Sequence, residues 1–405
     1  MRSRFPVAGV ANDVNPANTI TAPTSETSDA KARITARAHE LGFDLVGFTD
    51  AAPFLSTMRV FQDRFDSGLL GQWRYTNDSI RKRCTPQDAL AEARSIVCTA
   101  TSYAVGEQPY DPNAPGLRGA ISCHSWGRDY HRVIGGRLRE LARFISDAFP
   151  GSRCLPCVDT GPLVDRAAAV RAGIGWFGRN GNVLTKRFGS WVLLGELITT
   201  LEIEPDDPLE TNCGTCPICI ERCPTKAIGE DGSIDARRCI SDLTQLKTPI
   251  PRELREAIGN RLWGCDDCQT PCPVNETESV AANRSTQGNP FAPLPQVGTS
   301  MDLTAVLHMT KSQYRDWFKP TSMAWRGKAV LQRNAAVALG NSRDRRAVPH
   351  LIVALDDRKS LVRGHVAWAL GRLGGDDARN ALKKRLEIED DAWVREEVEL
   401  ALGSA

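Results

Sequence analysis

The first half of the chain mixes helix-like and strand-like hydrophobic patterns. Residues 30–41 carry apolar side chains at helical spacing, with Ser28 and Asp29 as candidate caps and Gly42 as a stop signal. Strand-like and helix-like segments then alternate, at residues 43–51, 95–103, 132–149 and 191–203. This order predicts one α/β domain over residues 30–209.

The N-terminal residues 1–29 show no such pattern. They contain no apolar run, no small-residue cleavage site and no twin arginine, so we expect a mobile tail and no export signal. No stretch of the chain reaches the roughly 18 consecutive apolar residues that a transmembrane helix needs. We therefore expect a cytoplasmic protein with no membrane partner.

A repeat marks the C-terminal part of the chain. The tripeptide Ala-Leu-Gly ends a helical run three times, at 338–340, 369–371 and 401–403. Two of the copies are followed by a second amphipathic helix, which is typical of a short helical-pair solenoid of HEAT type. We assign this fold to residues 320–405; an ordinary helical bundle is the alternative. Residues 291–319, with their prolines, are interpreted as a linker.

Charge is unevenly distributed over these repeats. The whole chain of 405 residues has a net charge of only +2, which by itself predicts no nucleic-acid partner. Residues 326–385, however, hold 14 Lys and Arg against 5 Asp and Glu, whereas residues 386–405 hold 1 against 7. A basic stripe on a solenoid can follow phosphates. The nucleic-acid candidates open the first repeat: Arg326, Lys328 and Arg333. A solvated helix face is the alternative for each.

Residues 210–290 are irregular and contain most of the cysteines. Of 13 cysteines, eight lie between residues 213 and 272. The first four, Cys213, Cys216, Cys219 and Cys223, form the run C-x2-C-x2-C-x3-C-P, which is typical of 4Fe–4S ferredoxins. A zinc ribbon would instead show two separated C-x2-C pairs. The run therefore favours iron–sulfur ligation in a reducing compartment.

A second run is one cysteine short. CDDCQTPCP supplies only Cys265, Cys268 and Cys272, and Cys239 lies upstream. Two 4Fe–4S clusters need eight thiolates, and in ferredoxins the last cysteine of each run serves the other cluster. Crossing these cysteines gives two sets: Cys213, Cys216, Cys219 and Cys272 for one cluster, and Cys223, Cys239, Cys265 and Cys268 for the other.

Two clusters relay electrons but do not catalyse, so a redox centre is expected in the α/β domain. That domain has neither G-x-G-x-x-G after a strand nor a P-loop. Its glycine-rich stretch GIGWFGRNG, residues 173–181, suggests backbone packed against a large flat ligand. A set of tight turns explains the same glycines equally well.

Several segments together resemble the epoxyqueuosine reductase family. They are VDTGPLVDRAAAVRAGIGWFGRNG, GSWVLLGEL, the ferredoxin run, ARRCISDLT, GNRLWGCDDCQTPCP and QRNAAVALGN, in the family's order. The resemblance implies a multidomain α+β protein with a cobalamin-binding α/β reductase domain related to reductive dehalogenases, a ferredoxin-type two-cluster domain and HEAT-like repeats. It implies reduction of epoxyqueuosine to queuosine at the wobble position of tRNA, with an external electron donor. We expect a monomer.

The resemblance also implies site residues. The family's proton donor lies in VD-[ST]-x-P, which places it at Asp159; beside a corrin and shielded from water, this carboxyl group would have a raised pKa. Without the resemblance, a turn or Asx cap would be the preferred interpretation. Further candidates for cofactor or substrate contact are Cys123, Asp129, Tyr130, His131, Arg166, Trp176 and Asn180.

These further candidates have alternatives. Cys123 can be a buried structural cysteine, and Asp129 to His131 can cap a helix; His131 is also a candidate lower cobalt ligand. The sequence departs from the family at Trp73, where Met is frequent, and at Val274, where Trp is common. Two other functions stay open: a corrinoid reductase of a small substrate, as in dehalogenases, and an electron-transfer or scaffold protein without chemistry of its own.

Overall fold

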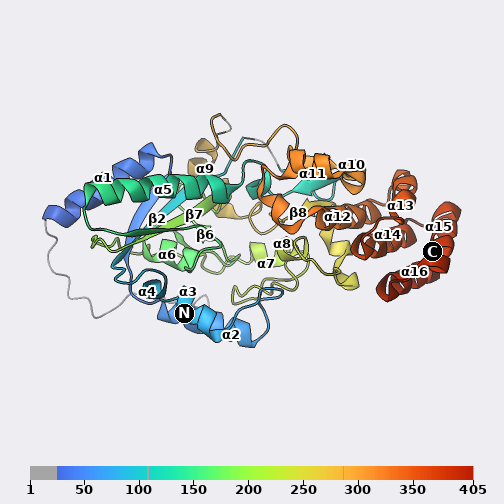
Figure 1. Cartoon of the computed structure of the whole chain (residues 1–405), viewed down its shortest axis with the longest axis horizontal. Coiled ribbons are helices and arrows are strands. Elements are labelled where there is room, and N and C mark those ends of the chain that lie inside the picture. The colour runs from blue at the N-terminus through green and yellow to red at the C-terminus, as the bar shows by residue number, and fades with distance from the viewer. Residues whose placement is uncertain (1–24, 107–108, 286, 405) are drawn as a thin grey trace.

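The computed structural model describes residues 25–106, 109–285 and 287–404, and it is elongated. Figure 1 shows the α/β domain at one end, the cysteine-rich segment in the middle and the helical repeats at the other end. Most of the predicted tail lies outside the described residues, but helix α1 (Ser25–Glu40) begins within it. Gly42 ends the helix as expected, with a φ of 88°.

The α/β domain is built on a four-stranded antiparallel sheet. Its order is β1 (Leu45–Asp50), β2 (Ser95–Ser102), β7 (Val192–Thr199) and β4 (Cys154–Cys157). Helices α1 and α5 (Tyr130–Ala148) cover one face and α6 (Asp165–Arg171) covers the other (Figure 1). A Cβ on Gly195 would lie 2.5 Å from Ile134, so this glycine lets α5 approach the sheet closely. The segments predicted at 43–51, 95–103, 132–149 and 191–203 are confirmed.

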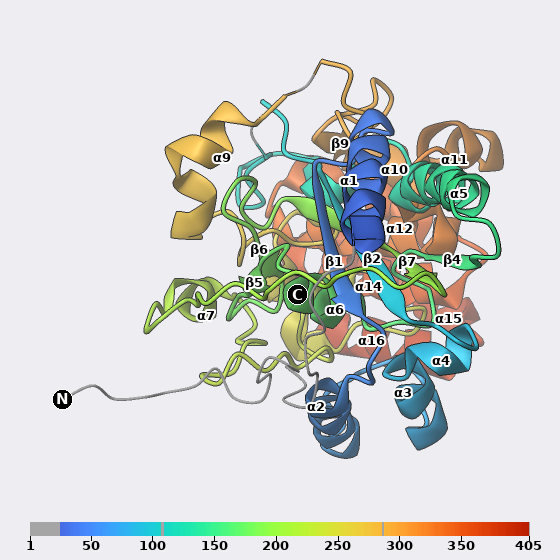
Figure 2. The same ribbon diagram turned by 90° about the vertical axis from the view of Figure 1, so that its left-hand side faces the viewer.

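Short elements complete this domain. They are α2 (Leu55–Asp66), α3 (Asn77–Arg83), α4 (Pro86–Ala89), the 3₁₀ turn η1 (Cys123–Ser125) and the hairpin of β5 (Trp176–Phe177) and β6 (Val183–Leu184). Seen from the α/β end in Figure 2, α2, α3 and α4 lie together below the sheet.

A second sheet joins the α/β domain, the cysteine-rich segment and the predicted linker. Strand β3 (Arg118–Ile121) pairs in parallel with β8 (Arg261–Trp263) of the cysteine-rich segment and antiparallel with β9 (Ser300–Asp302). Helices α10 (Leu303–His308) and α11 (Lys311–Phe318) follow β9. The interpretation of residues 291–319 as a linker was therefore wrong. Its elements are three to eight residues long, too short to show a clear hydrophobic period.

The cysteine-rich segment has little core of its own. It contains short helices and turns: α7 (Ile218–Arg222), α8 (Ile240–Leu243), η2 (Arg252–Leu254), η3 (Glu256–Ile258), η4 (Pro273–Glu276) and α9 (Glu278–Ala282). Among its described residues, only Cys223, Ala227 and Ile228 form a separate buried cluster. Its other buried apolar side chains, such as Leu243 and Leu262, belong to the main core, which runs from α1 to α16.

The C-terminal helices form the predicted repeats. The inner helices α12 (Lys328–Asn341), α14 (Ser360–Leu373) and α16 (Ala392–Ser404) pack on one another, with α13 (Val348–Ala354) and α15 (Asp376–Ile388) outside; η5 (Ser322–Arg326) and η6 (Arg345–Ala347) are 3₁₀ turns. The repeated glycines explain the spacing. A Cβ on Gly340 would lie 2.9 Å from Ala369, and one on Gly371 would lie 2.7 Å from Ala401.

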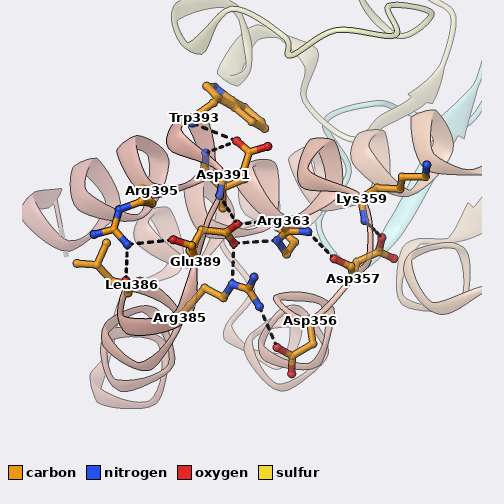
Figure 3. Close-up of polar contacts among 11 residues, drawn as sticks. Asp356, Asp357, Lys359, Arg363, Arg385, Leu386, Glu389, Asp391, Trp393 and Arg395 are labelled. Atoms are coloured by element: carbon orange, nitrogen blue, oxygen red, sulfur yellow. Dashed lines mark hydrogen bonds and ion pairs between the residues drawn. The ribbon is translucent and has the colours of Figure 1, made fainter.

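Buried ion pairs hold the outer repeat. Figure 3 shows Glu389, fully buried, accepting hydrogen bonds from Arg363 (2.6 and 2.8 Å) and Arg385 (2.7 Å). Although burial alone would raise it, these guanidinium groups lower the pKa of Glu389 to about 2. Two cations of the basic stripe, Arg363 and Arg385, and the acidic Glu389 therefore pair with one another inside the protein.

Arg333 joins the repeats to the cysteine-rich segment. Its side chain is 0% exposed, and its guanidinium donates to the carbonyl oxygens of Thr248, Leu243, Thr244 and Leu246 at 3.0–3.3 Å. Arg255 makes a second joint, with two hydrogen bonds of 2.9 and 2.6 Å to Glu397 of α16. The prediction that Arg333 meets a phosphate therefore fails, because its donors already serve the fold.

Within the described part of the chain, no helix is both long and apolar enough to cross a membrane.

The glycine contacts predict different costs for the same substitution in successive repeats. Gly371→Ala should destabilise the protein by roughly 1–3 kcal/mol, because the new methyl group overlaps Ala401. Gly403→Ala is the matched control: no atom lies within 4 Å of its Cβ position, so only helix propensity changes, by up to about 1 kcal/mol in the stabilising direction. Thermal and denaturant unfolding measure both. Equal losses in the two variants would contradict this packing.

Candidate functional site

Four polar side chains meet where helix α5 begins. Asp129 caps the helix by accepting from the His131 backbone N–H at 3.1 Å, and its Oδ1 also lies 2.9 Å from His131 Nδ1. On the other side, Asp159 Oδ2 accepts from Tyr130 Oη at 2.7 Å and lies 3.4 Å from His131 Nε2. The cap and the functional candidate at residue 129 are thus the same side chain.

The two carboxylates determine the protonation of His131. Burial alone would lower its pKa, but the hydrogen bonds to Asp129 and Asp159 raise the pKa of His131 to about 9. The ring is therefore an imidazolium at neutral pH, with both nitrogens donating. Neither nitrogen is available as a metal ligand in this arrangement, so a role of His131 as lower cobalt ligand finds no support here.

Asp159 carries an exposed, ionised carboxyl group. Its side chain is 59% exposed, and hydrogen bonds from His131 and Tyr130, together with the charge of His131, lower its pKa to about 2. The raised pKa that we expect beside a bound corrin stays a prediction, because these values describe the protein alone. The backbone at this residue has a φ of 44°, in the left-handed region that non-glycine residues rarely adopt. Such strain is common at functional sites.

Cys123 precedes His124, whose pKa is affected by burial and by the charges of Asp159 and His131, and it is held by the CDDC segment. It is buried, and its backbone N–H donates to Asp266 Oδ2 at 2.8 Å. Asp266 Oδ1 accepts from Ser122 Oγ at 2.8 Å and from Gln269 Nε2 at 3.0 Å. Burial and the Asp266 carboxylate raise the pKa of the Cys123 thiol well above its usual value, so the sulfur keeps its proton.

Three further candidates, Asn180, Arg166 and Trp176, lie in or next to the glycine-rich hairpin. Asn180 donates to the carbonyl oxygen of Cys268 at 3.1 Å, so it fixes a cysteine loop. Arg166 donates to the carbonyl oxygen of Gly181 at 2.9 Å. Trp176 is buried, and its indole N–H has no partner. The hairpin glycines serve tight turns and close packing, since a Cβ on Gly175 would lie 2.2 Å from the carbonyl oxygen of Leu184.

Two acidic groups behind Asp159 were not anticipated. Glu196 is 0% exposed on β7. Within the described part of the chain, neither of its carboxyl oxygens has a hydrogen-bond partner, and buried Asp165 Oδ1 has none either. Burial, reinforced by the charge of Asp165, raises the pKa of Glu196 well above its usual value, and burial with Asp159 nearby raises that of Asp165 to about 7. Glu196 is therefore neutral. Its place in an otherwise apolar run, WVLLGELI, was the available signal.

The first three cysteines of the first run, Cys213, Cys216 and Cys219, lie near Cys272. Burial and the thiols of Cys213, Cys272 and Cys216 raise the pKa of Cys219 to about 11. Burial raises the pKa of Cys272 as well, and the nearby thiols of Cys213 and Cys216 add to this rise. All four side chains are half-buried. The structure thus brings together the four residues that the sequence assigns to one cluster.

The other four cysteines form a deeper neighbourhood. Burial, followed by the charges of Cys265 and Cys239, raises the pKa of Cys268 well above its usual value. Burial also raises the pKa of Cys239, and Cys223 adds a smaller contribution in the same direction. Cys223, Cys239 and Cys268 also pack in one apolar cluster. Among the described residues, no three His, Cys, Asp or Glu side chains converge on one metal-ion position.

A buried arginine accompanies the second set. Arg261 is 4% exposed, pairs with Asp267 and donates to the carbonyl oxygen of Ile258 at 2.7 Å. The guanidinium charge also lies close enough to Cys265 to lower the pKa of that thiol, although burial raises it overall. The two aspartates of CDDC therefore have separate partners: Asp266 holds the Cys123 loop and Asp267 holds Arg261. Two adjacent acids between predicted ligands were a signal that such partners exist, because buried charges need them.

The remaining nucleic-acid candidates lie at the start of the repeats. Arg326 and Lys328 are half-buried. Lys328 Nζ donates to Gln332 Oε1 at 2.7 Å, whereas the Arg326 guanidinium lies over the ring of Trp325, 3.5 Å from its centroid. Both keep part of their cationic surface.

Three known family models match separate parts of the chain. The family described as epoxyqueuosine reductase QueG, DUF1730, matches residues 83–160. A 4Fe–4S double cluster binding domain matches residues 212–275, and HEAT repeats match residues 326–403. The chain thus contains a double-cluster domain and C-terminal HEAT repeats.

Similar proteins match over nearly the whole length. The chain is 38% identical to an epoxyqueuosine reductase of Bacillus anthracis over 375 residues, which is 92% of this chain and 96% of that protein. A crystal structure of epoxyqueuosine reductase with an epoxyqueuosine-modified tRNA stem loop superposes with a TM-score of 0.86 at 36% identity, covering 93% and 99%. A Bacillus subtilis epoxyqueuosine reductase, solved with a catalytic loop swung out of the active site, has the same TM-score at 35% identity, covering 93% and 99%.

The charge arrangement at α5 predicts the titration of His131. We expect NMR of the protein without added cofactor to give a pKa near 9 for His131 in the wild type. Asp159→Asn should move it toward the ordinary value of about 6.5, because one of the two anions that favour the imidazolium is lost. Asp147→Asn, at the far end of α5, is the control. A wild-type pKa near 6.5 would contradict the described geometry.

Proposed function

The chain belongs to the epoxyqueuosine reductase family, and we propose that it reduces epoxyqueuosine to queuosine at the wobble position of tRNA. In this proposal, an external donor supplies electrons, which two 4Fe–4S clusters pass to cobalamin. The protein works as a cytoplasmic monomer. The observation that carries the proposal is the match to relatives of that activity over 96% of their length, with every predicted cluster cysteine and Asp159 present. Nothing in these comparisons favours the dehalogenase-like or scaffold alternatives.

The cysteine arrangement fits two clusters. Eight thiols lie in two neighbourhoods, and thiolate is the ligand that iron–sulfur clusters require. The less buried set, with Cys213 and Cys216, supports an entry point for electrons at the surface. The deeper set adjoins Cys123 and Asn180 through Asp266 and Cys268. We therefore propose that Cys223, Cys239, Cys265 and Cys268 hold the cluster nearer the reaction.

The α/β domain fits a ligand such as cobalamin, whose rim of amide side chains both donates and accepts hydrogen bonds. The unpartnered Trp176 indole N–H offers a donor, and Asp165 Oδ1 offers an acceptor, close to Asp159. Buried polar atoms without partners are rare in folded proteins, and a ligand is one reason for them. We propose that Trp176 and Asp165 contact the cofactor, together with Cys123. Bound cobalamin would supply the reducing cobalt that the side chains themselves lack.

We propose that the side chains at α5 pass protons to the substrate one at a time, and that solvent water reprotonates His131 to supply the second proton. Converting an epoxide to an alkene and water consumes two electrons and two protons. His131 carries a proton at neutral pH and points it at Asp159, which lies on an exposed loop. We propose that Asp159 receives this proton and delivers it to the departing epoxide oxygen, while Tyr130 orients the carboxyl group. The low pKa of Asp159 makes it a relay, and His131 is the proton store.

Contacts to the tRNA are proposed at Arg326 and Lys328. Both retain exposed cationic surface at the start of the basic repeats, and phosphate contacts of this kind give salt-dependent affinity. Arg333 is not included, because it is buried.

Asp159→Asn should lower turnover of epoxyqueuosine-containing tRNA by about 10²- to 10⁴-fold, the range for loss of a general acid. Absorbance and iron content should stay those of the wild type, because the side chain belongs to neither cysteine set. Asp147→Asn, an exposed change of the same type, should leave turnover unaltered. Normal turnover by Asp159→Asn would show that the proton reaches the substrate by another route.

Cys239→Ala should remove one cluster and spare the other. Iron per chain then falls from about eight to about four after anaerobic reconstitution, because Cys239 serves only the deeper set. Cys154→Ala, a half-buried cysteine outside both sets, is the control and should keep about eight. Iron analysis and EPR of the reduced protein measure the result. A variant that still holds two complete clusters would refute the assignment of Cys239.

A further inference from the structure

Two exposed tryptophans from distant parts of the chain lie side by side. Trp73 is 42% exposed and Trp325 is 51% exposed, and their rings are stacked at 6.0 Å between centroids with an interplanar angle of 17°. The Arg326 guanidinium lies 3.5 Å from the Trp325 centroid and 5.4 Å from that of Trp73. We call these three residues the tryptophan platform.

The platform is held in a fixed orientation from below. Trp73 Nε1 donates to Asp242 Oδ1 at 2.9 Å, and Gln72 Nε2 donates to the same oxygen at 2.9 Å. Asp242 is only 7% exposed on α8, three residues after the predicted ligand Cys239. The buried Nε of Arg326 has no hydrogen-bond partner. An oriented indole and an unsatisfied guanidinium nitrogen distinguish this patch from scattered exposed apolar residues, which are common on proteins.

The chemistry of the platform fits an unpaired nucleotide. Planar aromatic rings stack on nucleobases, and a guanidinium group both stacks on bases and pairs with phosphate. Arg326 also begins the basic segment 326–385. A planar base with an anionic backbone therefore complements both halves of the platform.

The position favours an RNA over a protein electron donor. The platform rests on Asp242, three residues after Cys239. Cys213 and Cys216 are instead flanked by exposed residues, 211–212, 214–215 and 217, and so offer the shorter entry for electrons. The segment that carries Trp73 also leads back to the site at α5. Arg64, at the end of α2, is close enough to Arg166 for the Arg166 charge to add to the lowering of its pKa by burial. The same Arg166 charge helps to lower the pKa of Asp159.

We propose that the tryptophan platform stacks an unpaired base of the tRNA anticodon loop that flanks the modified nucleotide, while Arg326 pairs with its phosphate. This inference rests on the proposed function, because it takes that tRNA as the substrate. It adds a contact that selects single-stranded RNA by stacking, beyond the charge attraction of the basic repeats.

Binding and turnover of a synthetic anticodon stem–loop RNA, with and without epoxyqueuosine, test the platform. Trp73→Ala and Trp325→Ala should each weaken Kd by roughly 5- to 100-fold, the effect of losing one stacked base. The change should appear in Kd and KM and not in kcat. Trp325→Phe should recover most of the affinity, because a smaller ring still stacks. Ile388→Ala truncates an even more exposed apolar side chain on α15 and should leave Kd unchanged.

The possible outcomes separate the two proposals. Unchanged Kd in both alanine variants, with wild-type turnover intact, would overturn the platform and leave the function standing. Variants that bind RNA normally but accept electrons slowly from a protein donor would also overturn it, in favour of a donor site. If the wild type binds the RNA through Trp73 and Trp325 but never reduces epoxyqueuosine, the platform stands and the proposed function fails.

Discussion

Asp266 accepts hydrogen bonds from the backbone of Cys123 and from Ser122, and so ties the loop of predicted cluster ligands to the loop beneath the candidate active site. The rest of the molecule depends on this kind of joint. The cysteine-rich segment has a small separate core, so neighbouring elements must hold it in place. Asn180 holds it from the α/β domain, and Arg333 and the Arg255–Glu397 pair hold it from the repeats. Electron transfer falls steeply with distance, which makes such fixation a functional requirement.

The proton side and the electron side of the candidate site are controlled by different charges. Charges near His131 keep a proton available at neutral pH, because two carboxylates outweigh the effect of burial. Near the deeper cysteines, Arg261 contributes a buried positive charge that favours extra electron density on a cluster. In both places an oppositely charged partner fixes the side chain: Asp159 for His131, and Asp267 for Arg261. The strained backbone at Asp159 carries an exposed side chain.

Sequence reasoning identified what local spacing determines. The ferredoxin run and the Ala-Leu-Gly repeat are set by short-range spacing, whereas Cys239 was predicted as a ligand by counting thiolates. The structure places the cysteines and the repeat glycines close to one another. Sequence reasoning could not give the environment of Asp159, because that depends on where α5 begins relative to a loop about thirty residues away. Arg333 was misjudged for a related reason. A cation on an inner solenoid helix looks exposed until the segment that packs on it is known. Strand β9, only three residues long, carries no readable period.

The central claim is that this chain removes the oxygen of epoxyqueuosine with electrons delivered through its own clusters. The most direct measurement is anaerobic reaction of the reconstituted protein with epoxyqueuosine-containing tRNA, cobalamin and a chemical reductant, followed by mass spectrometry of the nucleosides. We expect queuosine, one oxygen atom lighter than the substrate nucleoside, to form only when cobalamin and reductant are both present. Unchanged epoxyqueuosine in a protein that holds about eight irons and bound cobalamin would contradict the account.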